Sequence, residues 1–120
     1  MYIIDRVAKP IVWVGTALED LRAFPDKARS RAGYQLQRVQ TGQAPNDWKP
    51  MGSVGAGVCE IRVHTDHEHR VFYVAKYDDA VSVLHAFEKR TRKTRAADIA
   101  LARQRLRQIP RLRAEGKNEP

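Results

Sequence analysis

The chain has little cysteine, no glycine-rich phosphate loop and no long apolar run. A lone cysteine, Cys59, excludes an internal disulfide, and its apolar neighbours predict a small buried thiol in a reducing compartment, the cytoplasm. Near the amino terminus the apolar stretch 11–14 is far shorter than the roughly 18 residues of a membrane span, so we expect a soluble protein without a secretory segment. The sequence also lacks paired cysteines for zinc and any Ser/His/Asp order typical of a hydrolase triad.

Positive charge is what the sequence has in excess, and it is unevenly placed. The formal net charge is +8, and the segment from Lys89 to Arg113 holds ten basic residues against one acid, Asp98. A segment this one-sided favours a polyanion or an acidic protein partner over a merely solvated helix.

The order of predicted elements gives an α+β fold. A strand is expected over 9–14, a short helix from a Thr16/Glu19 capping box to residue 23 or 24, and a longer helix over 26–41 ended by Gly42. Residues 43–57 are rich in glycine and proline and predict a mobile loop, with Trp48 and Met51 folded onto the core.

The second half of the chain alternates in steps of two and then turns helical. Strands are expected over 58–65, 70–77 and 81–89, forming an antiparallel meander, followed by a helix over 95–109 that Pro110 ends. We predict a single domain, 1–113, with a polar tail, 114–120. Its small antiparallel sheet would have strand-helix-helix-strand-strand-strand-helix order, with the helices on one face and charge on the other.

Histidine and acidic residues gather at the expected turn between two of these strands: His64, Asp66, His67, Glu68 and His69. These side chains are of types that bind transition metals. Residues at a hairpin tip are usually solvated, and alternation points them in different directions, so we predict no metal site here and no cofactor.

Cationic and imidazole groups on the expected sheet are the better site candidates. Tight turns would bring Arg62 and Arg70 within cross-strand range, and two close guanidinium groups call for an anion such as a phosphodiester. Metal-free RNA cleavage uses the substrate's 2′-hydroxyl, so the protein supplies charge stabilisation and proton transfer. His85, Tyr73 or a lysine are candidates for proton transfer. The alternatives are that the arginines only pair with Glu60, Glu68 or Asp66, and that Tyr73 and His85 are core residues.

Within 58–103 the sequence contains Glu60-Ile-Arg62, Arg70-Val-Phe-Tyr73, Leu84-His85-Ala86-Phe87, Lys89-Arg90-Thr91, Lys93-Thr94 and the helix residues Ala102 and Arg103. In these segments the chain resembles the RelE/HigB toxin superfamily, and in particular its phage-derived HigB-like branch. The most distinctive part is Phe87, Lys89, Lys93 and Thr94 after a strand. The preceding strand and two helices match the order of that fold as well.

The resemblance implies the toxin of a type II toxin-antitoxin system, an mRNA interferase that cleaves messenger RNA on the ribosome and arrests growth. Its partners would be messenger RNA, the ribosome and a cognate helix-turn-helix antitoxin, with no membrane. The catalytic candidates are Arg62, Arg70, His85 and Lys89, and the RNA-binding candidates are Lys76, Arg90, Arg92 and Lys93. Two other readings stay open: a ParE-like toxin that inhibits DNA gyrase without cleaving RNA, and a non-toxic nucleic-acid-binding module.

Overall fold

The computed structural model describes residues 8–117 and places five strands in one mixed sheet. The elements are β1 (Ile11–Trp13), α1 (Ala17–Arg22), α2 (Asp26–Gln40), β2 (Trp48–Pro50), β3 (Val58–His64), β4 (Glu68–Val74), β5 (Val81–Glu88) and α3 (Ala96–Lys117). The strands lie in the order β1-β5-β4-β3-β2. The predicted α+β class is confirmed. The sheet is not purely antiparallel, because β1 runs parallel to β5, and β2 is an edge strand inside the predicted loop.

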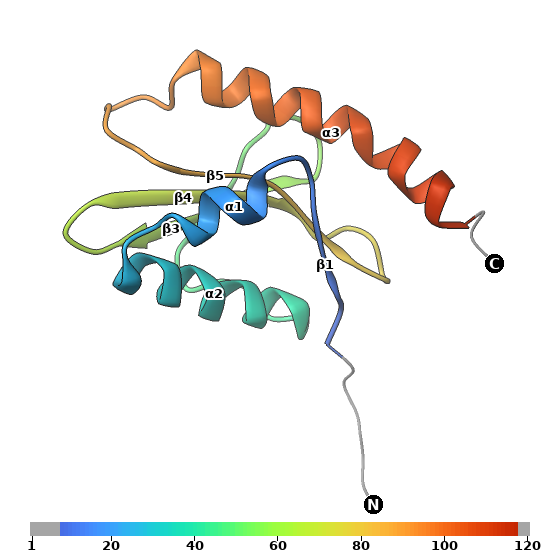
Figure 1. The fold of residues 1–120 in the computed structure, drawn as a ribbon, viewed down its shortest axis with the longest axis horizontal. Helices are drawn as coiled ribbons and strands as arrows, with labels where there is room; N and C mark the ends of the chain where they lie inside the picture. The colour runs from blue at the N-terminus through green and yellow to red at the C-terminus, as the bar shows by residue number, and fades with distance from the viewer. Residues whose placement is uncertain (1–7, 118–120) are drawn as a thin grey trace, which may run out of the picture.

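Helices cover both faces of the sheet (Figure 1), with α1 and α2 on one face and α3 on the other. The prediction that all helices share one face is wrong. One core cluster joins Leu21 and Leu36 of the first two helices to Ile61 of β3, and a second joins Phe72 of β4 to Ile109 of α3. The row of apolar residues along α3 is narrow, and a buried arginine adds hydrogen bonds that hold the helix against the sheet.

That arginine is Arg105, which is 7% exposed and ties three elements together. Its guanidinium donates to the carbonyl of Leu84 on β5 at 2.9 Å and to the Thr16 hydroxyl at 2.8 Å, just before α1. Gly15 has φ +59°, and a Cβ there would lie 2.6 Å from Arg105 Nε. The tight turn after β1 therefore needs glycine both for its backbone conformation and for the close approach of Arg105.

A β-bulge interrupts the pairing of β4 with β5. Phe72 pairs with His85 and Tyr73 pairs with Val83, so Leu84 is an extra residue on β5. Leu84 therefore packs in the cluster under α3, while Val83 packs in the cluster under α1 and α2. Beyond the bulge, the α3-facing positions are His85 and Phe87, the register partners of Phe72 and Arg70.

The last helix runs through Pro110 to Lys117 instead of ending before the proline. Proline removes one helical hydrogen bond, which makes it a poor interior residue. Contacts beyond it hold the final turns in place: Arg113 pairs with Asp79 at 3.0 Å and stacks over the Tyr77 ring at 4.0 Å. Helix therefore continues into the predicted polar tail.

Two local predictions also differ from the structure. Thr16 precedes α1 but makes no side-chain cap bond, because its hydroxyl donates to Asp20 and accepts from Arg105. Trp48 is 42% exposed, whereas Met51 is buried as predicted. The loop after β2 is anchored to α3 by a bond from Arg103 to the Ser53 carbonyl at 2.7 Å.

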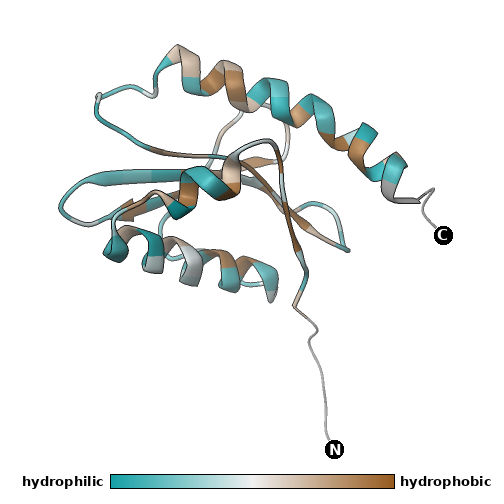
Figure 2. Cartoon of the chain, in the orientation of Figure 1, coloured by the Kyte–Doolittle hydropathy of each residue, from teal (hydrophilic) through white to brown (hydrophobic). Residues whose placement is uncertain are grey.

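Hydrophilic residues concentrate at the end of the sheet that carries the β3–β4 hairpin and the loop before α3 (Figure 2). Within residues 8–117, no helix combines the length and the apolar character needed to cross a bilayer.

Candidate functional site

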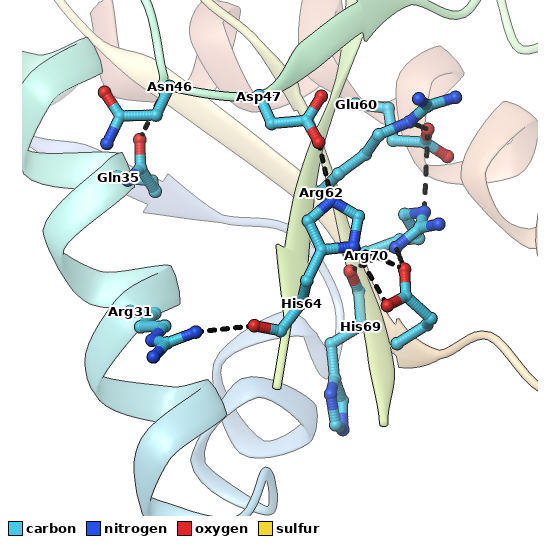
Figure 3. A network of polar contacts seen from close by, with 10 residues as sticks. Arg31, Gln35, Asn46, Asp47, Glu60, Arg62, His64, His69 and Arg70 are labelled. Atoms are coloured by element: carbon cyan, nitrogen blue, oxygen red, sulfur yellow. Dashed lines mark hydrogen bonds and ion pairs between the residues drawn. The ribbon is translucent and has the colours of Figure 1, made fainter. Parts of the chain in front are cut away.

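The candidate site lies on the α3 side of the sheet, at its hydrophilic end. Alternation along β3 brings Glu60, Arg62 and His64 to this side, and register with β4 adds Arg70 and Glu68. We call these five residues, together with Asp47 just before β2, the polar face; their close contacts are drawn in Figure 3.

Arg62 and Arg70 are direct register partners across β3 and β4, as predicted. Between them lies the Glu60 carboxylate, whose Oε1 is 3.2 Å from Arg62 Nε and 3.8 Å from Arg70 Nε. Arg70 also donates to Glu68 at 3.0 Å and to the His69 carbonyl. The protein itself therefore supplies part of the negative charge that the two arginines require. This agrees with the alternative prediction that the arginines pair with Glu60 and Glu68, but it does not support the pairing with Asp66.

Glu60 is an unusual residue in this position because it is only 1% exposed. Its second oxygen, Oε2, is buried and has no hydrogen-bond partner within residues 8–117. A buried carboxylate is costly unless it is paired, so Glu60 and the two arginines depend on one another. Arg62 is the accessible member, with 32% of its side chain exposed against 7% for Arg70.

His64 sits beside Arg62 at the edge of the polar face and is held between two carboxylates. Nδ1 lies 2.7 Å from Glu68 Oε1, and Nε2 contacts Asp47 Oδ2. These hydrogen bonds, Asp47 first and Glu68 second, raise the pKa of His64 above its ordinary value, because they favour the imidazolium form with two N–H donors. The same contact with His64 lowers the pKa of Glu68.

The arrangement around His64 spans three parts of the chain. Arg31 of α2 donates to the His64 carbonyl, while Asp47 precedes β2 and Glu68 opens β4. The two carboxylates lie at opposite nitrogens of one ring. Among the described residues, no group of three His, Cys, Asp or Glu side chains forms a metal-binding cluster.

The catalytic candidate Lys89 and the predicted RNA-binding residues divide between the two ends of the sheet. Lys89 extends β5 next to Glu68, whose carbonyl accepts its backbone N–H at 2.7 Å, and it is half-buried. Arg90, Arg92 and Lys93 follow it in the exposed loop before α3, where Arg90 pairs with Glu88. Lys76 lies beyond the other end of β4, with its carbon chain against Gly57 and its Nζ 5.5 Å from the Tyr77 ring centre. It is therefore not part of the polar face.

Within residues 8–117, the proton-transfer candidates His85 and Tyr73 make no hydrogen bond or ion pair with the two arginines. His85 is 6% exposed, and its Nε2 contacts Asp98 Oδ1 of α3 at 2.8 Å. Tyr73 is buried on the α2 side of the sheet, next to Cys59, and this burial raises its pKa. This placement agrees with the alternative prediction that Tyr73 is a core residue.

Sequence reasoning missed Glu60, His64 and Asp47 as members of the site. Alternation along β3 was a sufficient signal for Glu60 and His64, because it already placed them on the same side as Arg62. Nothing in the local sequence could bring in Asp47, since it reaches the face only through the pairing of β2 with β3.

The fold and face together define a small α+β domain with a site at one end of its sheet, in which two arginines and a histidine lie among three carboxylates. A family model described as "Phage derived protein Gp49-like (DUF891)" matches residues 19–107. This match covers most of the chain, from α1 to the middle of α3, and the protein belongs to this family. A search of curated proteins finds no match.

Proposed function

We propose that this protein is the toxin of a type II toxin-antitoxin system and an endoribonuclease that cleaves messenger RNA. Membership of the Gp49-like family, which is associated with such toxins, supports the toxin role. The observation that carries the RNA-cleaving role is the cross-strand pair of Arg62 and Arg70 on an accessible face.

In this proposal the arginine pair binds the scissile phosphate. Arg62 is the member that reaches solvent, and Arg70 behind it adds charge and is held by Glu68 and the His69 carbonyl. As the phosphorane forms, its oxygens gain negative charge, which fixed guanidinium donors stabilise. Glu60 keeps both side chains in place and is a positioning residue.

The reaction consistent with such a site is transesterification within the RNA. The 2′-oxygen forms a bond to phosphorus and gives its proton to solvent water, and the bond from phosphorus to the 5′-oxygen breaks. The products are a 2′,3′-cyclic phosphate and a 5′-hydroxyl, and the leaving oxygen needs a proton. His64 is the accessible imidazole on the polar face, and its contacts with Asp47 and Glu68 raise its pKa and so favour the protonated ring; we assign it the transfer of this proton.

Basic residues outside the centre would guide the RNA strand and the partners. Lys89, Arg90, Arg92 and Lys93 lie at the same end of the sheet as the arginine pair. The solvent side of α3 adds Arg103, Arg107 and Arg111. This surface suits ribosome-bound messenger RNA in the cytoplasm, and an antitoxin with a helix-turn-helix domain would neutralise the toxin by covering it.

Induced expression in a bacterial host tests the proposal. Wild type should arrest growth and create new message ends in primer extension, and Arg62→Ala/Arg70→Ala should lower cleavage by at least about a hundredfold. The matched control is Lys27→Ala/Arg29→Ala, which removes two exposed charges from α2 on the opposite side and should stay toxic. Growth arrest with intact messages would refute RNA cleavage and favour gyrase inhibition, and no arrest would favour a binding module.

A further inference from the structure

A cleft opens along β5 beyond the point where its pairing with β1 ends. This cleft is distinct from the polar face. Residues 85–88 of β5 form its floor, the end of α1 with Phe24 forms one side, and Asp98 in the first turn of α3 with Arg95 forms the other. The cleft lies next to the polar face, because Phe87 is the register partner of Arg70.

Aromatic rings line this cleft from both sides of the sheet. The Phe24 ring centre lies 4.4 Å from that of His69. His85 and Phe87 are stacked, with centres 4.8 Å apart and planes at 19°. Flat apolar surfaces of this kind favour a flat, aromatic ligand.

Two nitrogen atoms in the lining lack partners within the described part of the chain. They are Nδ1 of His69, a residue 1% exposed, and Nδ1 of His85. The Asp98 carboxylate can only accept at His85 Nε2, so in the neutral ring Nδ1 of His85 is an acceptor. Burial lowers the pKa of His69, which favours its neutral ring. Orphaned buried polar atoms are rare in proteins and call for an explanation.

The charges around the cleft disfavour a phosphate within it and favour a group rich in hydrogen-bond donors. Three carboxylates line it, those of Asp20, Glu88 and Asp98, against the single guanidinium of Arg95. Glu88 is reachable, with 29% of its side chain exposed, and Arg90 and His67 hold its pKa low. A carboxylate accepts two parallel N–H donors, and among the RNA bases guanine presents such a pair on its Watson–Crick edge.

We propose that this cleft is a nucleobase subsite, which takes an RNA base along β5, beside Phe87 and Glu88, and prefers guanine. The inference rests on the proposed RNA substrate and assigns His85 to base binding instead of catalysis. A base held next to Phe87 places its nucleotide beside Arg70, so the subsite selects the sequence adjoining the cleaved bond. Uracil, with one ring N–H between two carbonyl oxygens, is the base that this acceptor-rich cleft suits least.

Titration with ribonucleoside monophosphates tests this directly, with protein from cell-free synthesis and imidazole NMR as the readout. GMP and UMP carry the same phosphate, so a difference between them reports on the base. GMP should shift the ring signals of His69 and His85, with an affinity about tenfold above that of UMP. Glu88→Gln should remove most of that preference, while Glu115→Gln, an exposed acid near the end of α3, should retain it.

Three outcomes would overturn the subsite: no shift at His69 and His85, equal affinity for GMP and UMP, or a preference that Glu88→Gln leaves intact. Binding of a peptide in the cleft with no effect of nucleotides would instead identify a protein-docking groove. The result is independent of the cleavage assay. A protein that binds GMP here but leaves messages intact would retain the subsite and lose the endoribonuclease, and the reverse would lose only the subsite.

Discussion

On the side of the sheet that faces α3, one half is buried core and the other half is the polar face, although the same strands build both. Along β3, every second residue faces this side: Val58 and Glu60 are 2% and 1% exposed, and the side chains of Arg62 and His64 are 32% and 51% exposed. Helix α3 covers the first part with Ala102 and Ile109, and the loop before it leaves the second part open. Because α3 covers only part of this side of the sheet, the covered part is hydrophobic core and the uncovered part is the candidate site.

The largest effect is expected in the covered half. Phe72→Ala should lower the free energy of unfolding by about 3–5 kcal/mol, because the side chain is fully buried against Phe87 and the cluster under α3. Urea denaturation measures this change. His64→Gln in the open half is the comparison and should cost less than about 1 kcal/mol, because the His64 side chain is half exposed. Equal losses would show that the two halves are not distinct.

A middle-sized effect is expected at Glu60, where the two halves meet. Glu60→Gln keeps the shape but removes the buried charge, and it should lower the free energy of unfolding by about 1–3 kcal/mol. The control is Lys49→Gln, the exposed register partner of Glu60 on β2, expected within about 0.5 kcal/mol of wild type. If both variants matched wild type, Glu60 would not hold the arginines.

The smallest effect is a pH dependence at the outer edge of the polar face. Because the pKa of His64 is raised on folding, its ion pairs stabilise the fold fully below the ordinary value of 6.5. That contribution is lost as the pH rises through the folded-state pKa. Wild type should therefore lose more stability than His64→Gln over this range, by a small amount because His64 is half exposed.

Thermal unfolding at several pH values measures this difference. His67→Gln is the control, since His67 is an exposed histidine at the same turn, 3.8 Å from Glu88. Identical pH profiles for wild type and His64→Gln would refute the shift. The same titration should lower RNA cleavage above the folded-state pKa, because the proposed proton donor is then lost.

Local patterns were enough to predict the class of the fold and part of the site. Period-two alternation located β3, β4 and β5, and tight turns between them were enough to pair Arg62 with Arg70. Long-range pairing was not predictable from such patterns. The parallel match of β1 to β5, the edge strand β2 and the passage of α3 through Pro110 all depend on distant contacts, such as that of Arg113 with Asp79.

The burial of charged residues was the harder part to predict. Local sequence patterns do not distinguish Glu60, Arg105 or the pair of His85 and Asp98 from ordinary exposed polar residues. The reason is that their partners come from other helices and strands. A charge buried with its partners cannot be told from a solvated one by local periodicity alone.

The bulge gives β5 one residue more than its pairing with β4 requires. Val83 and His85 pair with the consecutive residues Tyr73 and Phe72, so a chain without Leu84 would keep His85 and Phe87 on their present side of the sheet. The loss would fall on α3 instead, because the Leu84 carbonyl accepts from Arg105 and the Leu84 side chain packs under the helix. One residue added after His85 would have the opposite effect and send Phe87 and the position of Lys89 to the other side of the sheet. Insertions in relatives of this protein should therefore gather in the exposed loop between β5 and α3 and avoid the end of β5.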